Sequence, residues 1–115
     1  MTNNDILRRI RYIFDLSDDK MIKLFALAEM EVSRAEVSDW LKKEEDPDAE
    51  IILDQELASF LNGFISDRRG KREGPQPIAE KRLNNNLILR KLKIALNLKN
   101  EDMLDIFALA DRHLS

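Results

Sequence analysis

Residues 3–33 of this chain recur as residues 85–115 with no insertion or deletion between the two copies. Of the 31 aligned pairs, 12 are identical, and many of the others exchange like for like, as Ile10 does with Leu92 and Arg11 with Lys93. An ungapped repeat of this length is typical of one supersecondary unit used twice. The repeat therefore restricts the chain to folds that can be built from two similar units.

Apolar residues follow a helical period along the chain, and no segment alternates apolar and polar residues with period two. Helix caps are indicated by Thr2 with Asp5, by Ser17, and by Ser33 with Glu36. The sequence thus predicts an all-α fold of tandem helical repeats, with four helices in the first unit and two in the second. The expected helices cover about 3–15, about 18–30, a short stretch between Ser33 and Lys42, a long stretch that starts at Pro47 behind an Asp46 cap, about 85–97 and about 100–112.

The composition divides the chain into a first repeat over residues 1–67, a basic Gly/Pro linker over 68–84 and a second repeat over 85–115. Only the first 31 residues of the unit recur, so we expect a fragment of a parent protein of roughly 150 residues. The apolar stripes of the second repeat would then lack the helices that cover them in the first. We expect a homodimer, with self-association through Leu89, Leu92, Leu96 and Phe107.

Charge is unevenly distributed along the chain. Residues 17–67 contain 5 basic and 14 acidic side chains, a net charge of −9, whereas residues 68–100 contain 10 basic and 2 acidic ones, a net charge of +8. The basic band suggests a polyanion-binding surface; the alternative is a solvated helix face, or basic helices that dock on an acidic half. The candidate polyanion-binding residues are Arg8, Arg11, Arg68, Arg69, Lys71, Arg72, Arg90 and Lys93.

Residues 27–41 resemble a helix-turn-helix, in which a second helix that begins near Ser33 would enter the major groove. The first helix and turn are one residue shorter than in the usual pattern, and the turn contains no glycine. Glu36 and Asp39 on the second helix would repel phosphates. We therefore expect a plain helical hairpin with Trp40 in the core, and keep DNA binding as the weaker alternative.

Several kinds of chemistry have little support in this sequence. The chain has no Cys and a single His, His113, and the Asp46-x-Asp48-x-Glu50 run lacks the Gly and the bidentate Glu that a calcium loop requires. No glycine-rich phosphate loop follows a strand, and no acidic residue interrupts an apolar stripe. We expect no metal, no cofactor and no enzymatic activity. No apolar run reaches the length of a membrane span, and a cytoplasmic protein is expected.

Three motifs stand out in the sequence: Asn-Asn-x-Ile-Leu-Arg at 3–8 and 85–90, Phe-Ala-Leu-Ala at 25–28 and 107–110, and Phe-Leu-Asn-Gly-Phe at 60–64. In these motifs the sequence resembles the YehS-like family of small bacterial proteins. The resemblance implies a duplicated, all-helical fold and brings no assigned activity, cofactor or site residue.

These observations favour a non-catalytic helical interaction or regulatory module with a protein partner or a second copy of itself. The alternative is a nucleic-acid-binding protein that uses the basic helix faces and linker, or the helix-turn-helix-like segment. Neither hypothesis involves a membrane.

Overall fold

The computed structural model describes residues 2–70 and 77–96, and within these ranges the chain is helical, with no strand. The helices are α1 (Asn3–Ile13), α2 (Asp18–Leu27), α3 (Arg34–Leu41), α4 (Asp54–Arg69) and α5 (Asn85–Leu96). The expected all-α class is confirmed. The helix predicted over about 100–112, together with Lys71, Arg72, Phe107 and His113, lies outside the described residues.

The first three helices begin where the capping residues predicted. The hydroxyl groups of Thr2, Ser17 and Ser33 accept hydrogen bonds from the main-chain N–H groups three residues further on, at 3.1 Å in each case. In α1 and α3 an acidic side chain also accepts from the N–H of the capping residue, which completes a capping box. These three starts follow from local sequence alone.

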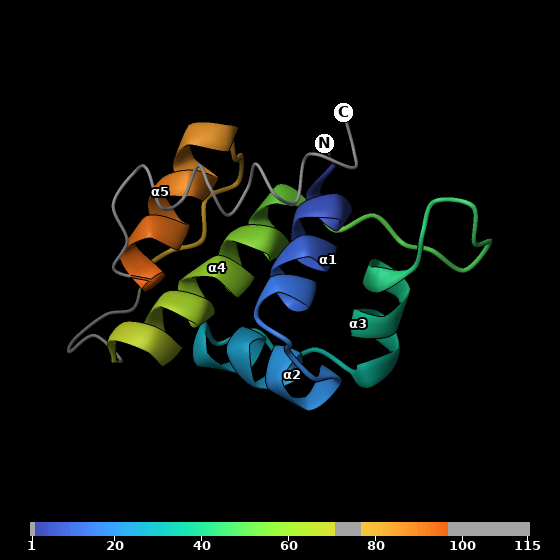
Figure 1. The fold of residues 1–115 in the computed structure, drawn as a ribbon, viewed down its shortest axis with the longest axis horizontal. Helices are drawn as coiled ribbons and strands as arrows, with labels where there is room; N and C mark the ends of the chain where they lie inside the picture. Colours follow the sequence, from blue (N-terminus) through green and yellow to red (C-terminus); the bar gives the residue numbers. More distant parts are fainter. Residues whose placement is uncertain (1, 71–76, 97–115) are drawn as a thin grey trace.

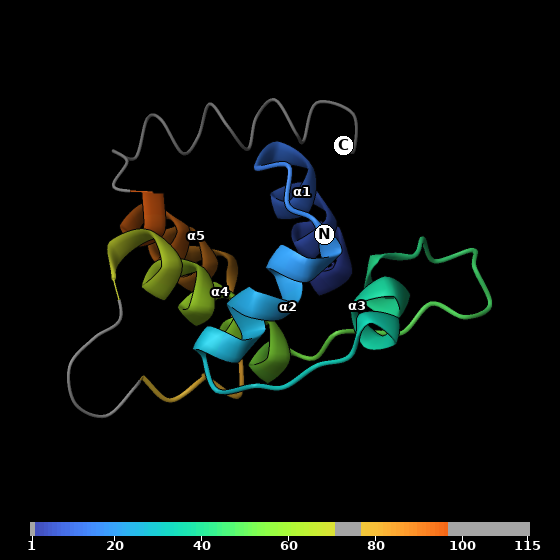
Figure 2. The ribbon, with the colours of Figure 1, turned by 90° about the horizontal axis from the view of Figure 1, so that it is seen from below.

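Helix α4 lies at the centre of the molecule, between α5 on one side and α1 on the other (Figures 1 and 2). The packing of α4 against both α2 and α5 is extensive, whereas α3 packs on α1 and α2. Aromatic rings fill the middle of the first four helices, with the Phe25 ring centroid 5.2 Å from Phe60 and 5.3 Å from Trp40. Trp40 is buried, as expected.

Helix α4 begins seven residues later than predicted, so the prediction of a helix start at Pro47 is wrong. The Asp46 side chain accepts a hydrogen bond from the N–H of Asp48 at 2.9 Å, and its carbonyl accepts one from the N–H of Ala49. These bonds form a turn in place of a helix cap. The chain then runs extended to Leu53, and the helix starts at Asp54.

The backbones of α2 and α4 approach each other closely at Gly63. A Cβ atom added at this position would lie 1.7 Å from the carbonyl oxygen of Leu24. Only glycine fits such an approach, so Gly63 sets how tightly α4 packs on α2. Ala26, the first alanine of the Phe-Ala-Leu-Ala run at 25–28, is exposed and does not make this approach.

Helix α5 begins at Asn85, 82 positions after the start of α1 at Asn3. Its apolar stripe lies against α4, and Leu92 is 1% exposed. Leu89 and Leu96 are half-buried and pack against the same core. The apolar face of α5 is thus covered by α4 of the same chain. No described helix is long and apolar enough to cross a membrane.

Candidate functional site

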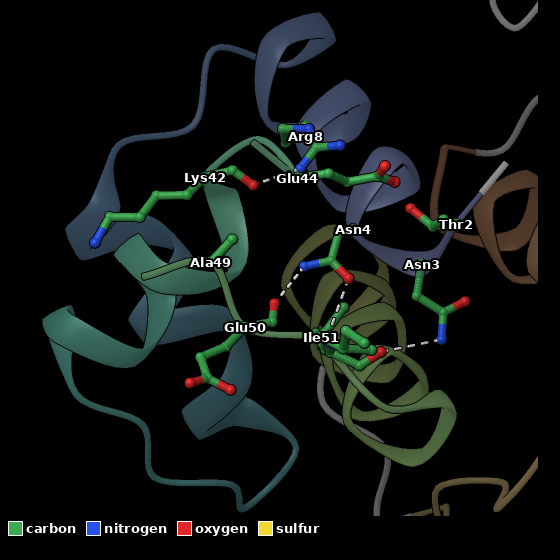
Figure 3. Close-up of a pocket in the computed structure, with 10 residues that line it drawn as sticks. Thr2, Asn3, Asn4, Arg8, Lys42, Glu44, Ala49, Glu50 and Ile51 are labelled. Carbon is green, nitrogen blue, oxygen red and sulfur yellow. Dashed lines mark hydrogen bonds between the residues drawn. The ribbon is translucent and has the colours of Figure 1, made fainter. Parts of the chain in front are cut away.

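Asn3 and Asn4, at the start of α1, bind the extended segment that precedes α4 (Figure 3). The Asn4 amide donates hydrogen bonds to the carbonyls of Glu50, at 2.6 Å, and of Trp40, at 2.9 Å, and it accepts one from the N–H of Ile52, at 3.1 Å. The Asn3 amide donates to the carbonyl of Ile52 at 3.2 Å. The two side chains thus pair with the segment as a neighbouring β-strand would.

A pocket of about 370 Å³ lies between the N-terminus of α1 and residues 42–52. On one wall the Arg8 guanidinium donates to the carbonyl of Lys42 at 2.8 Å and forms an ion pair with Asp5. Burial raises the pKa of Asp5, but hydrogen bonds with Thr2 and Arg8 outweigh that effect and leave the pKa below its usual value. Because its polar groups are paired with one another, this pocket joins α1 to the loop and offers few free groups for a ligand.

A second pocket, of about 360 Å³, opens beside α3 and the same extended segment. Ile52 is buried, but its two neighbours turn outward: Ile51 is 79% exposed and Leu53 is 62% exposed. Four carboxylates surround these side chains, and they belong to Glu36, Asp39, Glu50 and Glu56. We call this surface, Ile51 and Leu53 with the four carboxylates, the acidic-apolar patch.

The helix-turn-helix-like segment, residues 27–41, covers the last residue of α2, the connection that follows it and α3. Glu29 adopts φ +62° in that connection, a left-handed conformation in which glycine is the more usual residue. Arg34, the first residue of α3, forms ion pairs with Asp19 and, at 3.8 Å, with Asp18. The only basic side chain of α3 is thus paired with acids of α2, beside the exposed Glu36.

The candidate polyanion-binding residues are spread over several surfaces. Arg8 is engaged at the start of α1, and Arg11 forms an ion pair with Asp18 at 3.5 Å. The Arg68 guanidinium lies over the rings of Phe14 and Phe64, 5.6 and 5.4 Å from their centroids. Lys93 is half-buried, whereas Arg69 and Arg90 are exposed.

Arg69 and Arg90 line the same groove, which runs between α4 and α5 and has a volume of about 590 Å³. Two buried polar side chains also reach it, Asn62 from α4 and Lys91 from α5. The Lys91 ammonium donates a hydrogen bond to the side-chain amide oxygen of Asn62 at 2.6 Å. It also lies 3.0 Å from a carboxylate oxygen of Glu80. Lys91 was not among the residues selected from the sequence.

Of the expected self-association residues, Leu92 is covered by α4 and is not available to a second copy in this conformation. Leu89 and Leu96 retain part of their surface, and Phe107 lies outside the described residues. Among the described residues, no group of three His, Cys, Asp or Glu side chains is arranged to hold a metal ion.

The role of Asn3 and Asn4 was missed in the sequence, where an Asn-Asn pair ahead of an apolar stripe suggests helix capping. The caps are instead Thr2 for α1 and, for α5, Asn84, whose side chain accepts from the N–H of Leu87 at 2.8 Å. One indication was present: Thr2 already supplied a capping box, which left the two asparagines without a role.

The described structure defines a small all-helical protein with surface grooves between its helices. The chain belongs to the family described as "Protein of unknown function (DUF1456)", whose model matches residues 3–70 and 85–115. It is 41% identical, over 107 residues, to "Uncharacterized protein YehS" of Escherichia coli strain K12; the match covers 92% of this chain and 69% of that protein. The resemblance to the YehS-like family is thereby confirmed. No solved structure matches the chain significantly.

Proposed function

We propose that this protein is a non-catalytic interaction module built from two tandem helical units, and that it binds a protein partner through the acidic-apolar patch. The observation that carries the proposal is the exposure of Ile51 and Leu53 on either side of the buried Ile52. Together these two aliphatic side chains form an apolar surface that a partner can cover. The tandem arrangement is supported by the 31-residue repeat and by the two segments that the family model matches.

Charge and shape indicate the kind of partner. One of the four carboxylates, that of Asp39, is ion-paired with Lys42 at 2.7 Å. The remaining acidic charge around two aliphatic side chains favours a segment that presents apolar residues between lysines or arginines. Hydrogen bonds from the Asn3 and Asn4 side chains hold the main chain of the segment that carries Ile51 and Leu53. Binding of a partner therefore requires little further ordering of that main chain. A preorganised apolar centre with a charged rim is typical of protein interfaces.

A photoreactive amino acid at position 51 tests the proposal. We expect a discrete crosslinked protein in lysate treated with nuclease, and we expect Leu53→Lys in the same chain to reduce the yield at least tenfold. Ile78, which is 89% exposed and does not line the pocket of the acidic-apolar patch, gives the matched control position. Equal crosslinking at 51 and 78, or no effect of Leu53→Lys, would exclude the acidic-apolar patch as the contact surface.

The alternative function is nucleic-acid binding, and the observation in its favour is that Arg69 and Arg90 line one groove. Against it, Arg8, Arg11 and Arg34 are held by carboxylates, so their charge is already balanced. Binding to phosphates would weaken steeply between about 50 and 200 mM salt. The charge reversals Arg90→Glu and Lys93→Glu should then abolish duplex binding at 50 mM salt, and unchanged binding would reject this surface.

A homodimer also remains part of the proposal, with Leu89, Leu96 and Phe107 as the contact residues to test. Leu92→Glu is unsuitable because it would detach α5 from α4. Sedimentation at several concentrations, with Leu89→Glu for comparison, gives the answer. A single monomeric species at all concentrations would exclude self-association.

A further inference from the structure

The groove between α4 and α5 places hydrogen-bond donors below an apolar rim. Ile65 and Leu87 line its walls, and Ile94 stands at its edge. Among these apolar side chains lie the Asn62 amide and the Lys91 ammonium, in residues that are 7% and 9% exposed. The groove thus combines aliphatic walls with one buried pair of polar side chains, Asn62 and Lys91, while Arg69 and Arg90 lie exposed along it.

The Asn62 side chain is left incompletely paired at that position. Its oxygen accepts from Lys91, but its NH₂ group, although buried, has no hydrogen-bond partner within the described part of the chain. A buried donor without an acceptor costs roughly 1–3 kcal/mol, so such groups are uncommon in folded proteins. An acceptor atom that enters the groove would remove this cost.

The charge around the groove favours an anion as the source of that acceptor. Arg69, Arg90 and Lys91 contribute three positive charges, and Glu80, which lies against Lys91, contributes one negative charge, which leaves a net charge of +2. The two arginines are exposed, and a ligand can reach them without any change in the helices. An ammonium group has three donors, of which Asn62 takes one, while Glu80 contributes an ion pair at 3.0 Å and its buried Oε1 accepts no hydrogen bond from the described residues.

The depth of the donors restricts the shape of the ligand. Phosphates of a duplex lie on a wide, rigid surface and can contact Arg69 and Arg90, but they cannot reach a lysine that is 9% exposed between two helices. A single terminal anionic group on a narrow apolar body can enter. Its body would cover Ile65, Leu87 and Ile94, which gives the aliphatic walls a partner.

We propose that the groove between α4 and α5 binds a small amphiphilic anion, whose carboxylate or phosphate monoester head meets Asn62, Lys91 and Arg90 and whose aliphatic body lies along the groove. This site is formed by α4 and α5, at the end of the molecule opposite α3 and the acidic-apolar patch (Figures 1 and 2). It does not depend on the proposed protein interaction.

Titration calorimetry on the full chain with decanoate and with decyl phosphate, each below its micelle concentration, tests the site. We expect saturable binding of one ligand per chain for at least one of the two, and the stronger ligand identifies the head group. Decanol, which has the same tail without the charge, should bind at least tenfold more weakly. Absence of saturable binding for both anions would overturn the proposal.

Two variants locate the binding. Arg90→Glu changes an exposed rim residue and should weaken binding at least tenfold, and Lys91→Met should weaken it further. Lys23→Glu makes the same charge change at an exposed position of α2, outside the groove, and should leave the affinity within twofold. If Lys23→Glu weakens binding as much as Arg90→Glu does, the binding is non-specific and the site is rejected. Because Arg90 is exposed, this comparison remains valid even if Lys91→Met fails to fold.

Discussion

At the scale of single residues, the side chains of Asn3 and Asn4 make main-chain hydrogen bonds of the kind that a neighbouring β-strand would make. Asn4 satisfies three main-chain groups: the Trp40 carbonyl and the Ile52 N–H in buried hydrogen bonds, and the Glu50 carbonyl in a part-buried one. An amide group is suited to this task because it carries both a donor and an acceptor. The Asn4 side chain therefore stabilises both α1, in which it lies, and the loop that it binds.

Asn4→Ala should lower the free energy of unfolding by about 2–4 kcal/mol, because three main-chain groups lose their partner at once. Urea denaturation followed by circular dichroism measures the change. The repeat provides a matched control: Asn86, the counterpart of Asn4, is exposed at the start of α5, and Asn86→Ala should change stability by less than about 0.5 kcal/mol. Equal effects of the two substitutions would contradict the role that we assign to Asn4.

Residue roles could be predicted from the sequence only where they are local. The capping boxes of Thr2 and Ser33 depend on residues three positions away, and both predictions are confirmed. The role of Asn4 depends on groups 36 to 48 positions away, and no local pattern contains that information. For the same reason, the burial of Lys91 cannot be predicted locally, because it depends on Asn62 of α4, 29 positions away.

At the scale of elements, the start of α4 shows how tertiary contacts override a local cap. Asp46-Pro47 is a good helix start by composition, but a helix through residues 50–53 would withdraw the main-chain groups that Asn3 and Asn4 bind. It would also rotate Ile52 out of the core, where it is fully buried. The extended segment satisfies both demands, and the helix begins after it.

Gly63→Ala should destabilise the packing of α2 on α4, because the new methyl group would collide with main chain that cannot rotate away. Overpacking of this kind costs about 1–3 kcal/mol or more. Gly70→Ala is the comparison: nothing lies within 4 Å of its Cβ position, and only the strain of φ +88° remains, roughly 1 kcal/mol. Thermal unfolding followed by circular dichroism compares the two, and a smaller loss for Gly63→Ala than for Gly70→Ala would contradict the close approach.

Trp40→Ala tests whether α3 is a structural element. The Trp40 ring packs on Phe25, so its removal should cost about 3–5 kcal/mol and unfold the first four helices together. Differential scanning calorimetry would report the lowered Tm. A variant of unchanged stability would mean that the ring contributes little to the core and that α3 is free to act as a recognition helix.

At the scale of the whole molecule, the uneven charge was visible in the sequence, but its arrangement was not. The acidic-apolar patch lies beside α3 and the groove lies between α4 and α5, at opposite ends of the molecule (Figure 1). Counting charges could not show that Arg8 and Arg11 are paired with aspartates, or that Arg68 lies over aromatic rings. The net charge of each segment was therefore a poor guide to which cations are free.

Asp54 connects the start of α1 to the segment just before α5. It is the first residue of α4, and one of its oxygens accepts from the Asn3 amide at 2.6 Å while the other accepts from the N–H of Leu83, just before α5, at 2.9 Å. The hydrogen bond from Asn3, and then that from Leu83, hold the pKa of Asp54 below its usual value. The ionised carboxylate thus holds the start of α1 and the segment before α5 on α4.

The pH dependence of this link is the last prediction. Because the pKa of Asp54 is lower in the folded than in the unfolded chain, its contribution is present above the usual carboxylate pKa of 3.8 and is lost as pH falls through the folded value. Asp54→Asn should therefore speed hydrogen exchange in α5 roughly threefold to tenfold at pH 7, as expected when hydrogen bonds to a charged acceptor become neutral ones. The difference from the unsubstituted chain should persist through pH 3.8 and shrink only at lower pH, where the native side chain is protonated at its lowered pKa. Glu45→Gln, at an exposed acid with no such link, should leave α5 exchange unchanged at every pH. If Asp54→Asn and Glu45→Gln behaved alike, α5 would be held on α4 by its apolar stripe alone.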